Sequence, residues 1–324
     1  MPAPRVLITG INGFAGSHLA ELCVSSGDQV AGTVQPRTDA ANVKPIRRAL
    51  DLISTDLLKP QQVHRALQRS KPQWIIHLAA STSVGDSFDD PASTIRNNVN
   101  TTLNLLEAIR SNATVRKHIE TILIVASSEV YGRVKPNQIP LTESTPLRPV
   151  NPYGASKAAV EMLAMTYRES FGLPIVHVRA SNHTGPRQRT GFVVPDFCHA
   201  IAQLERKTGK RVMKVGNLSA KRDFSDVRDI VQGYRQIAEK GKTGVVYHLG
   251  SGRARTVKSV LDSLLRMAEV TITVAADPKK MRPAEVPILR PDISRAQRDV
   301  GFKPTIPWTQ TLRDTLEYHR HSLL

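Results

Sequence analysis

The sequence predicts an α/β protein built on a doubly wound parallel sheet, with a smaller C-terminal substrate-binding domain. Short apolar runs alternate with longer segments of helical periodicity through the first 180 residues. That alternation is typical of crossover units in a parallel sheet. A chain of 324 residues is long enough for about two domains. We therefore expect a first domain over 1–180 and a second over 181–324, with some segments returning to the first.

Each expected element follows from a run of apolar residues or from helical spacing. In the first domain, strands are expected at 5–9, 29–34, 49–53, 73–78, 121–126 and 174–179, and helices at 14–26, 91–112 and 154–171. Beyond residue 180, prolines and glycines interrupt the pattern. Helices are expected there near 192–206, 226–240, 256–268 and 308–320.

The composition excludes several classes of protein. Apolar residues make up 40 % and charged residues 23 %, which is ordinary for a globular chain. Cys23 and Cys198 lie far apart, so neither a disulfide scaffold nor a cysteine-built zinc site is expected, and the histidines show no metal-ligand spacing. No secretory signal and no run long enough to span a membrane are seen. We expect a cytoplasmic protein with no membrane partner and no metal.

The net charge of +17 is concentrated in the second half. Residues 1–170 hold 18 basic and 14 acidic side chains, whereas the rest of the chain holds 27 and 14. Such a surface suits an anionic partner, whether nucleic acid, an acidic membrane or a nucleotide diphosphate. The basic run at 206–222 contains no aromatic residue, which disfavours nucleic-acid binding.

A glycine-rich turn separates the first expected strand from the first helix. The sequence TGINGFAG at 9–16 has the spacing GxxGxxG, which allows a tight turn and close approach of a pyrophosphate to a helix N-terminus. A turn with incidental glycines is the alternative, but this placement favours a Rossmann-type dinucleotide site. The residues expected to form it are Gly10, Asn12, Gly13, Phe14 and Gly16.

The end of the second expected strand bears on the choice of cofactor. An NAD site usually has an acidic residue there, but this strand ends in Gln35-Pro36-Arg37. The Arg37 guanidinium could pair with a 2′-phosphate, or it could be a solvated loop residue. The sequence favours NADP(H), with NAD as the alternative. Asp56 and Leu57, after the strand-like run at 49–53, are expected beside the adenine.

A candidate catalytic group follows the strand expected at 121–126. Tyr153 and Lys157 are four residues apart, so on a helix they share a face. The ammonium can stabilise a phenolate, and the phenol can give or take a proton at a substrate oxygen. Ser127, at the end of the strand, can hydrogen-bond the same oxygen. An exposed helical turn is the alternative for this spacing.

Together these motifs resemble the extended short-chain dehydrogenase/reductase family. Its pattern is matched by TGINGFAG, by LAA at 78–80, by SSEVYG at 127–132 and by PYGASK at 152–157. The resemblance continues into the nucleotide-sugar branch through NHTGP at 182–186, KVGNL at 214–218, RDFSDVRD at 222–229 and RPAEVP at 282–287. The last motif is shared by GDP-mannose 4,6-dehydratases and GDP-6-deoxy-4-ketomannose reductases. FVV at 192–194 and the RDF of the third motif look most like the reductases.

The resemblance implies a reaction and a set of roles. The reaction is NAD(P)H-dependent reduction of the C4 ketone of a GDP-4-keto-6-deoxy-hexose to a GDP-6-deoxy sugar of the GDP-rhamnose type. It implies a homodimer through the helices near 94–112 and 154–171. The implied catalytic residues are Ser127, Glu129, Tyr153 and Lys157; the further cofactor residues are Leu78, Ala79, Ala80 and Asn98; and the GDP-sugar residues are Asn182, Asn217, Arg222, Arg282 and Glu285.

Other functions remain open as alternatives, and two positions depart from the family pattern. Glu129 matches the glutamate of the dehydratases, so a GDP-mannose 4,6-dehydratase is the first alternative, followed by a 4-epimerase or a non-enzymatic dinucleotide sensor. Thr101 and Arg187 stand where the family commonly has glycine. Near the expected sugar pocket, Arg187 would add a phosphate contact or narrow the site. His183 is expected to orient its loop rather than act as a base.

Overall fold

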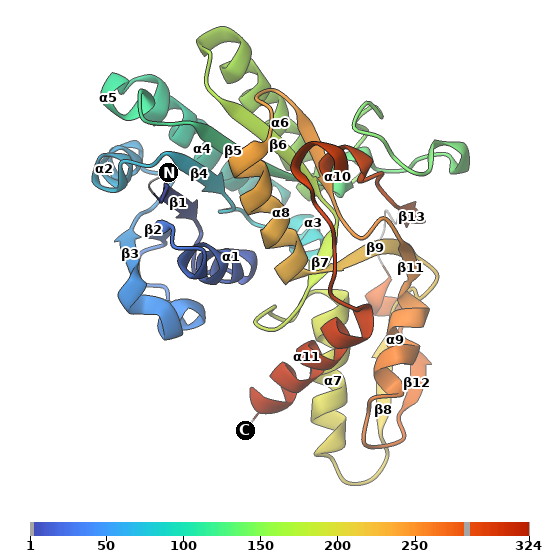
Figure 1. Ribbon diagram of the computed structural model, residues 1–324. Coiled ribbons are helices and arrows are strands. Elements are labelled where there is room, and N and C mark those ends of the chain that lie inside the picture. Colours follow the sequence, from blue (N-terminus) through green and yellow to red (C-terminus); the bar gives the residue numbers. More distant parts are fainter. Residues whose placement is uncertain (1–2, 282–285, 324) are drawn as a thin grey trace.

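A seven-stranded parallel sheet forms the larger part of the molecule (Figure 1). The computed structural model describes residues 3–281 and 286–323. The sheet runs in the order β10-β6-β5-β4-β1-β2-β3, and every neighbouring pair is parallel. Its strands are β1 (Arg5–Thr9), β2 (Gln29–Val34), β3 (Leu50–Ser54), β4 (Trp74–His77), β5 (Thr121–Ser127), β6 (Ile175–Ala180) and β10 (Val246–Leu249). The predicted doubly wound fold is thereby confirmed.

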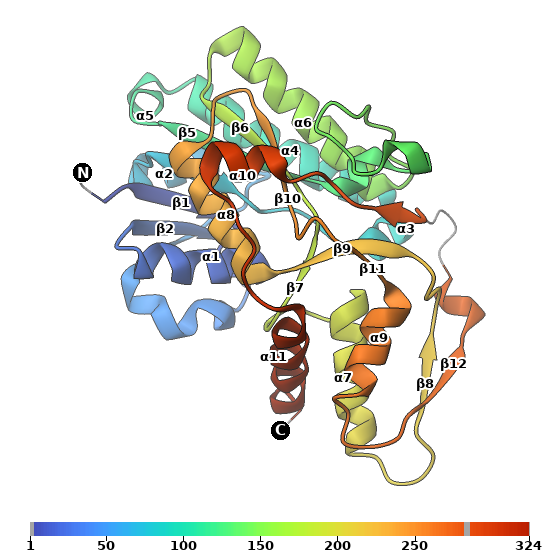
Figure 2. The ribbon, with the colours of Figure 1, turned by 45° about the vertical axis from the view of Figure 1, so that its right-hand side comes forward.

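Helices cover both faces of the sheet (Figures 1 and 2). One face packs on α1 (Phe14–Ser25), α8 (Val227–Lys240) and α10 (Ser294–Val300), and the other on α2 (Pro60–Ser70), α4 (Pro91–Arg110), α5 (Ala113–Arg116) and α6 (Pro152–Phe171). Alternate side chains of one strand enter opposite cores: in β1, Val6 and Ile8 face the first and Leu7 the second. Burial on both faces explains why these strands appear in the sequence as unbroken apolar runs.

The smaller part has its own core beneath the sheet (Figure 2). It contains α7 (Val193–Glu205), α9 (Val257–Leu265) and α11 (Trp308–His321), which pack on one another, and the parallel pair β8 (Val212–Val215) and β12 (Thr273–Ala276). In a second small sheet, β9 (Lys221–Asp226) pairs with β7 (Asn182–Thr184), β11 (Ala254–Thr256) and β13 (Ile288–Leu289). Short helical turns complete the chain: η1 (Ala41–Ala49), α3 (Val84–Asp89), η2 (Ser128–Tyr131), η3 (Pro136–Gln138) and η4 (Pro278–Lys280).

The two parts share chain segments. The second half of the sequence supplies α8, β10 and α10 to the large sheet and its cover. The strand order reverses between β1 and β4, and in open α/β sheets a crevice for ligands forms beyond the carboxyl ends of strands at such a point. In the described residues, no helix combines the length and apolar character needed to cross a membrane.

Candidate functional site

A cavity of about 1120 Å³ lies at the carboxyl ends of the strands, between the sheet and the smaller part. It exceeds the usual volume of a pocket for one small molecule, so it has room for a dinucleotide and a second ligand. Most residues predicted from the sequence line it: Gly10, Asn12, Gly13, Phe14, Gly16, Asp56, Leu57, Leu78, Ala79, Ala80, Ser127, Glu129, Tyr153, Lys157, Asn182, Asn217 and Arg222.

The glycine turn forms a cradle that side chains would fill. Gly10 has a φ of +69°, and a Cβ on Gly16 would lie 2.3 Å from the carbonyl oxygen of Gly10. Within the described chain, no side chain caps α1 at Gly13, so the first N–H groups of this helix remain available to an anion. The turn therefore fits the pyrophosphate of a dinucleotide.

Two predicted cofactor residues do not line this cavity. Arg37 is exposed, with a φ of +64°. Asn98 is buried, where its amide accepts from the N–H of Ser81 at 2.7 Å and donates to the Ser81 carbonyl at 3.0 Å and to Ser156 Oγ at 2.9 Å. Asn98 thus fixes the loop after β4 against α6 and does not itself face the cofactor region.

Arg187 lines the cavity and lies against α1. Its Nη2 is 2.7 and 2.8 Å from the two carboxylate oxygens of Glu21, and its Nη1 lies 3.5 Å from the carbonyl of Asn42. It lines the cavity together with Gln35 and Asn42, both in the segment that follows β2. Its φ of +72° is costly for a non-glycine residue and persists only where surrounding contacts enforce it.

The reacting end contains Ser127, Tyr153 and Lys157, all buried. Burial raises the pKa of Tyr153 to about 12, while a hydrogen bond with Ser127 opposes that rise. Burial also lowers the pKa of Lys157 to about 8, and its Nζ donates to the carbonyl of Val125 at 2.9 Å. The phenol is therefore protonated at neutral pH, as a proton donor must be, and Lys157 follows one helical turn later on the same face of α6.

The structure adds residues to this end that the sequence analysis missed. The buried Tyr234 of α8 lines the cavity. Asn151 caps α6 through a 2.7 Å bond from the N–H of Gly154. An asparagine just before a proline at the first helical position is a recognisable sequence signal for a cap.

Glu129 lies where the reacting end meets the smaller part. Its Oε2 accepts from Asn151 Nδ2 at 2.9 Å, and its Oε1 lies 3.8 Å from Arg222 Nε. The carboxylate lines the cavity but is itself buried. It is thus held from α6 on one side and from β9 on the other.

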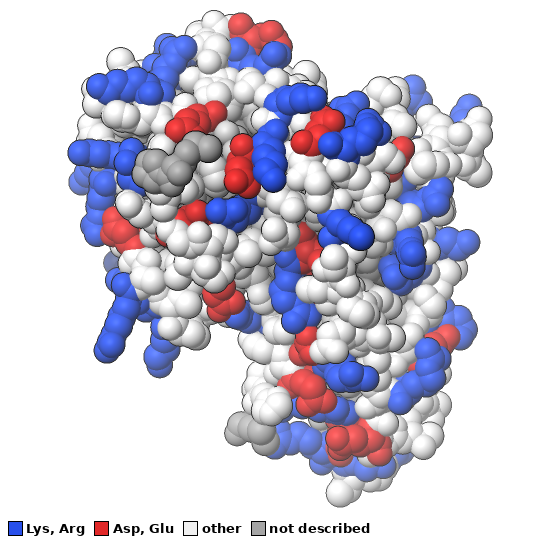
Figure 3. All heavy atoms as spheres, viewed as in Figure 1, with Lys and Arg blue, Asp and Glu red and all other residues white. Residues whose placement is uncertain are grey.

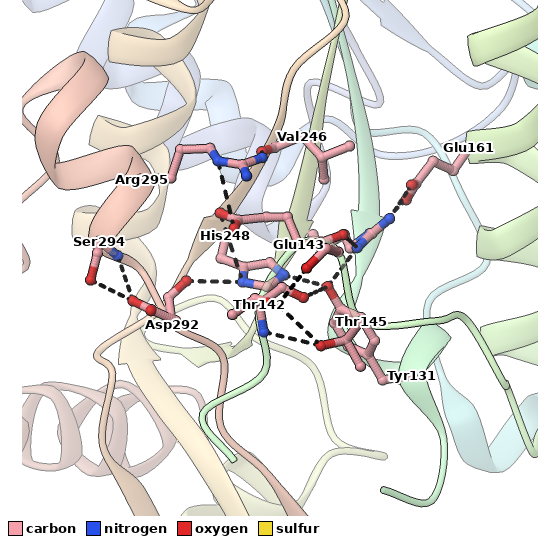
Figure 4. Close-up of polar contacts among 12 residues, drawn as sticks. Tyr131, Thr142, Glu143, Thr145, Glu161, Val246, His248, Asp292, Ser294 and Arg295 are labelled. Carbon is pink, nitrogen blue, oxygen red and sulfur yellow. Dashed lines mark hydrogen bonds and ion pairs between the residues drawn. The ribbon is translucent and has the colours of Figure 1, made fainter. Parts of the chain in front are cut away.

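A buried polar network lies behind η2, the turn that carries Glu129 (Figure 4). Tyr131, the last residue of η2, shares a 2.5 Å hydrogen bond with His248 Nε2 and accepts from Arg179 Nη1 at 2.6 Å. Arg179 also pairs with Glu161 of α6 at 2.5 and 3.0 Å. The network therefore joins the η2 turn, the catalytic helix α6 and the sheet edge at β6 and β10.

Polar and basic side chains line the far end of the cavity, in the smaller part. They include Asn217, Arg222, Lys214 and Lys280, and Lys280 Nζ donates to the carbonyl of Lys214 at 2.9 Å. Arg282 and Glu285, predicted to contact the GDP-sugar, lie outside the described residues. Basic and acidic side chains are interspersed on the face shown in Figure 3. In the described ranges, no group of three or more His, Cys, Asp or Glu residues is arranged to hold a metal ion.

His183 has the surroundings of a positioned loop residue. Its ring stacks on Phe14 at 5.9 Å, and its Nδ1 is bonded to the Ser181 carbonyl at 2.9 Å. Burial lowers the pKa of His183. These contacts hold β7, the short strand after β6, against the start of α1, which agrees with an orienting role.

A model of the family described as GDP-mannose 4,6 dehydratase matches residues 7–315. The chain belongs to this family. The match spans almost the whole sequence and confirms the resemblance seen in the motifs. Members of the extended short-chain dehydrogenase/reductase fold are also its neighbours among solved structures.

Individual relatives support the same family assignment. The chain is 31 % identical to GDP-6-deoxy-D-mannose reductase of Pseudomonas aeruginosa over 96 % of both chains. It is 30 % identical to GDP-mannose 4,6 dehydratase 1 of Arabidopsis thaliana, over 96 % of this chain and 88 % of the relative. The solved structure of RMD from Pseudomonas aeruginosa with NADPH superposes with a TM-score of 0.83 and 29 % identity, covering 99 % of this chain and all of the other.

The two departures from the family pattern have different consequences. Thr101, in the middle of α4, lines the cavity and bonds the carbonyl of Asn97 at 2.8 Å, so its extra side chain is accommodated. Arg187 occupies a position of positive φ, which explains why the family commonly has glycine there. The arginine keeps that backbone shape and adds a guanidinium.

Proposed function

We propose that the protein reduces the C4 ketone of a GDP-4-keto-6-deoxy-hexose to a GDP-6-deoxy sugar of the GDP-rhamnose type, with NADPH as reductant. One observation carries the proposal: a single cavity connects the glycine cradle at Gly10 to the buried pair Tyr153 and Lys157 and then to a basic end at Arg222. The similarity to a reductase of this kind, and to a structure that contains NADPH, supports it.

The chain's residues supply acid catalysis and electrostatic stabilisation. Bound NADPH would supply the hydride that reduces the carbonyl carbon. Tyr153 donates its proton to the developing alkoxide, and Ser127 hydrogen-bonds the same oxygen. Lys157, held by the Val125 carbonyl, places a positive charge behind the tyrosine and stabilises the phenolate that the transfer leaves. Fixed donors at a developing oxyanion usually contribute the largest part of the rate enhancement.

We propose Arg187 as the anchor of the cofactor 2′-phosphate, in place of Arg37. Arg187 lines the cavity beside Gln35, Thr38 and Asn42, the segment that follows β2 and meets the adenosine ribose in this fold. Glu21 holds its guanidinium through one nitrogen, and Nε makes no hydrogen bond within the described residues. A planar guanidinium suits a phosphate.

We propose that the basic end of the cavity binds the GDP portion, with Asn182 nearer the sugar. Lys214, Asn217 and Arg222 come from neighbouring segments of the smaller part, where cations and amides suit a diphosphate. GDP should therefore raise the melting temperature of the protein by mass action. Duplex DNA should bind weakly and lose affinity steeply with added salt. Tight, sequence-selective DNA binding at physiological salt would contradict the proposal that these basic side chains serve to bind GDP.

The dehydratase is the alternative that a specific observation favours. A 4,6-dehydratase must remove the proton at C5 and eliminate the C6 hydroxyl, and Glu129 is a buried carboxylate oriented into the cavity. The deciding experiment incubates the protein with the GDP-4-keto-6-deoxy sugar plus NADPH and, separately, with GDP-mannose alone. We expect stoichiometric NADPH consumption in the first reaction and little water loss in the second. Catalytic conversion of GDP-mannose without net cofactor oxidation would promote the lyase.

We also propose a cytoplasmic homodimer that pairs through α4 and α6. These helices pack side by side and expose apolar side chains: Ile95 at 40 %, Met162 at 48 % and Met165 at 39 %. Two such faces would bury one another in a second copy of the chain. Light scattering should report a dimer, and Met162→Glu together with Met165→Glu should yield monomers. A monomeric wild type would overturn the proposal.

A further inference from the structure

Asn151 joins two parts of the reacting end that lie 22 residues apart in the sequence. The buried side chain precedes Pro152, the first residue of α6. Its Oδ1 accepts from the N–H of Gly154 at 2.7 Å, while its Nδ2 donates to Glu129 Oε2 at 2.9 Å. One amide therefore caps the helix that presents Tyr153 and holds the Glu129 carboxylate.

The backbones of these two parts are also in contact. A Cβ on Gly154 would lie 2.7 Å from the carbonyl oxygen of Glu129, so the first turn of α6 rests directly on η2. The second carboxylate oxygen of Glu129 faces Arg222 at 3.8 Å. Glu129 is thus oriented by the start of α6 on one side and by the smaller part on the other.

The residue type fits both tasks at once. Serine, threonine and aspartate also cap helices, but ionised aspartate has no donor, and the hydroxyl of serine or threonine would have to serve both partners through one oxygen atom on a shorter side chain. The amide carries its acceptor and its donor on two separate atoms, so Oδ1 can bond Gly154 while Nδ2 reaches Glu129. The asparagine therefore does more here than a cap alone requires.

We propose that Asn151 is a positioning residue that sets the Glu129 carboxylate relative to the Tyr153 phenol, so that both groups meet the bound hexose in one geometry. The inference rests on the proposed function, because it assigns the hexose to the space between these groups. It concerns how Glu129 is held, and it applies whether Glu129 contacts a sugar hydroxyl or accepts a proton.

The test is a double-mutant cycle of Asn151→Ser with Glu129→Ala, because alanine removes the acceptor that Asn151 Nδ2 bonds. Serine can keep the helix cap through its one oxygen but lacks the Nδ2 group that reaches Glu129. We expect each single variant to lower kcat/KM for the 4-keto sugar by about three- to tenfold. The double variant should have a kcat/KM no lower than that of the less active single variant, because the effects of coupled residues are not additive. KM for NADPH should stay unchanged. Asn112→Ser is the matched control, since Asn112 caps the remote helix α5 in the same way.

Two outcomes would overturn the inference. Multiplying losses in the double variant would show that Asn151 and Glu129 act independently, as would an Asn151→Ser enzyme with wild-type kinetics. If Asn151→Ser folds poorly, Asn151→Thr offers a similar cap and likewise lacks the Nδ2 group that reaches Glu129. Should the wild type turn over neither sugar, the proposed function fails, and the crystal structure of Asn151→Ser then tests the positioning of Glu129 separately. A Glu129 carboxylate rotated away above an intact α6 supports the positioning role, and an unmoved carboxylate refutes it.

Discussion

The reacting end and the anion-binding end of the cavity are built in different ways. Tyr153 and Lys157 are less than 10 % exposed and are fixed by bonds to the strand β5 or its end. Anions are expected at two other places in the cavity, the 2′-phosphate site proposed at Arg187 and the basic end in the smaller part. The cations there are long, partly exposed side chains from separate segments: the Arg187 side chain is 21 % exposed, and Lys214 is exposed.

The difference follows from the distances over which the two ends act. Proton transfer needs donor and acceptor within hydrogen-bond reach, so the groups involved must be buried and held. An anion can be attracted by a charge from a flexible side chain several ångströms away, so the cation can come from any nearby segment. The first kind of site leaves a sequence motif, whereas the second depends on the tertiary fold.

The largest expected effect tests the reacting end. Tyr153→Phe should bind NADPH normally yet lose at least about a hundredfold in kcat, because the phenol acts as the general acid. Tyr167→Phe is the control, since Tyr167 lies on the same helix and its phenol bonds Glu107 instead. Stopped-flow hydride transfer measures both variants. Near wild-type turnover by Tyr153→Phe would remove the tyrosine from the mechanism.

A pH profile tests whether the ammonium of Lys157 supports the tyrosine. The pKa of Lys157 is lowered by burial to about 8, so the charged form predominates below that pH and is lost above it. We expect kcat to be flat at neutral pH and to fall as pH rises through about 8, approaching tenfold per pH unit if only the charged form is active. Lys157→Met should lower kcat throughout and abolish this limb. A limb that survives in Lys157→Met would assign the titration to another group.

The sequence alone was sufficient to predict an element where one or both of its faces are uniformly buried. The strands near 5–9 and 121–126 were found because both faces enter a core, and Tyr153 and Lys157 because they share a helical face. It did not reveal β9, whose residues Lys221–Asp226 are mostly polar: Arg222 lines the cavity, Asp223 bonds the turn at Ser251 and Asp226 caps α8. It also did not place Arg187, whose partner Glu21 is 166 residues away, nor show that Asn98 serves Ser81 rather than the cofactor.

A pair of arginines tests the anion-binding end with an intermediate effect. Arg37 and Arg187 both have positive φ, so glycine can replace either without backbone strain. Arg187→Gly should raise KM for NADPH at least about tenfold and leave KM for NADH nearly unchanged, because a charge-assisted bond to the 2′-phosphate is lost. Arg37→Gly should change neither value by more than about twofold. The reverse result would return the phosphate to Arg37, and equal effects on both cofactors would reduce Arg187 to a contact with α1.

The smallest expected effect concerns Glu129, which lies at the boundary of the two ends because it bonds Asn151 and faces Arg222. Hydride transfer to a C4 ketone needs no base at C5, whereas dehydration cannot proceed without one. Glu129→Gln keeps the size of the side chain and an acceptor for Asn151 but removes the charge and the basic oxygen. A reductase should therefore lose only about three- to tenfold in kcat/KM, the scale of one altered hydrogen bond. Steady-state NADPH oxidation with the 4-keto sugar measures this loss, with Tyr153→Phe as the reference for a catalytic deletion. A loss as large as that of Tyr153→Phe would make Glu129 a proton-transfer group in the limiting step, and the reacting end would then extend to η2 and favour the lyase.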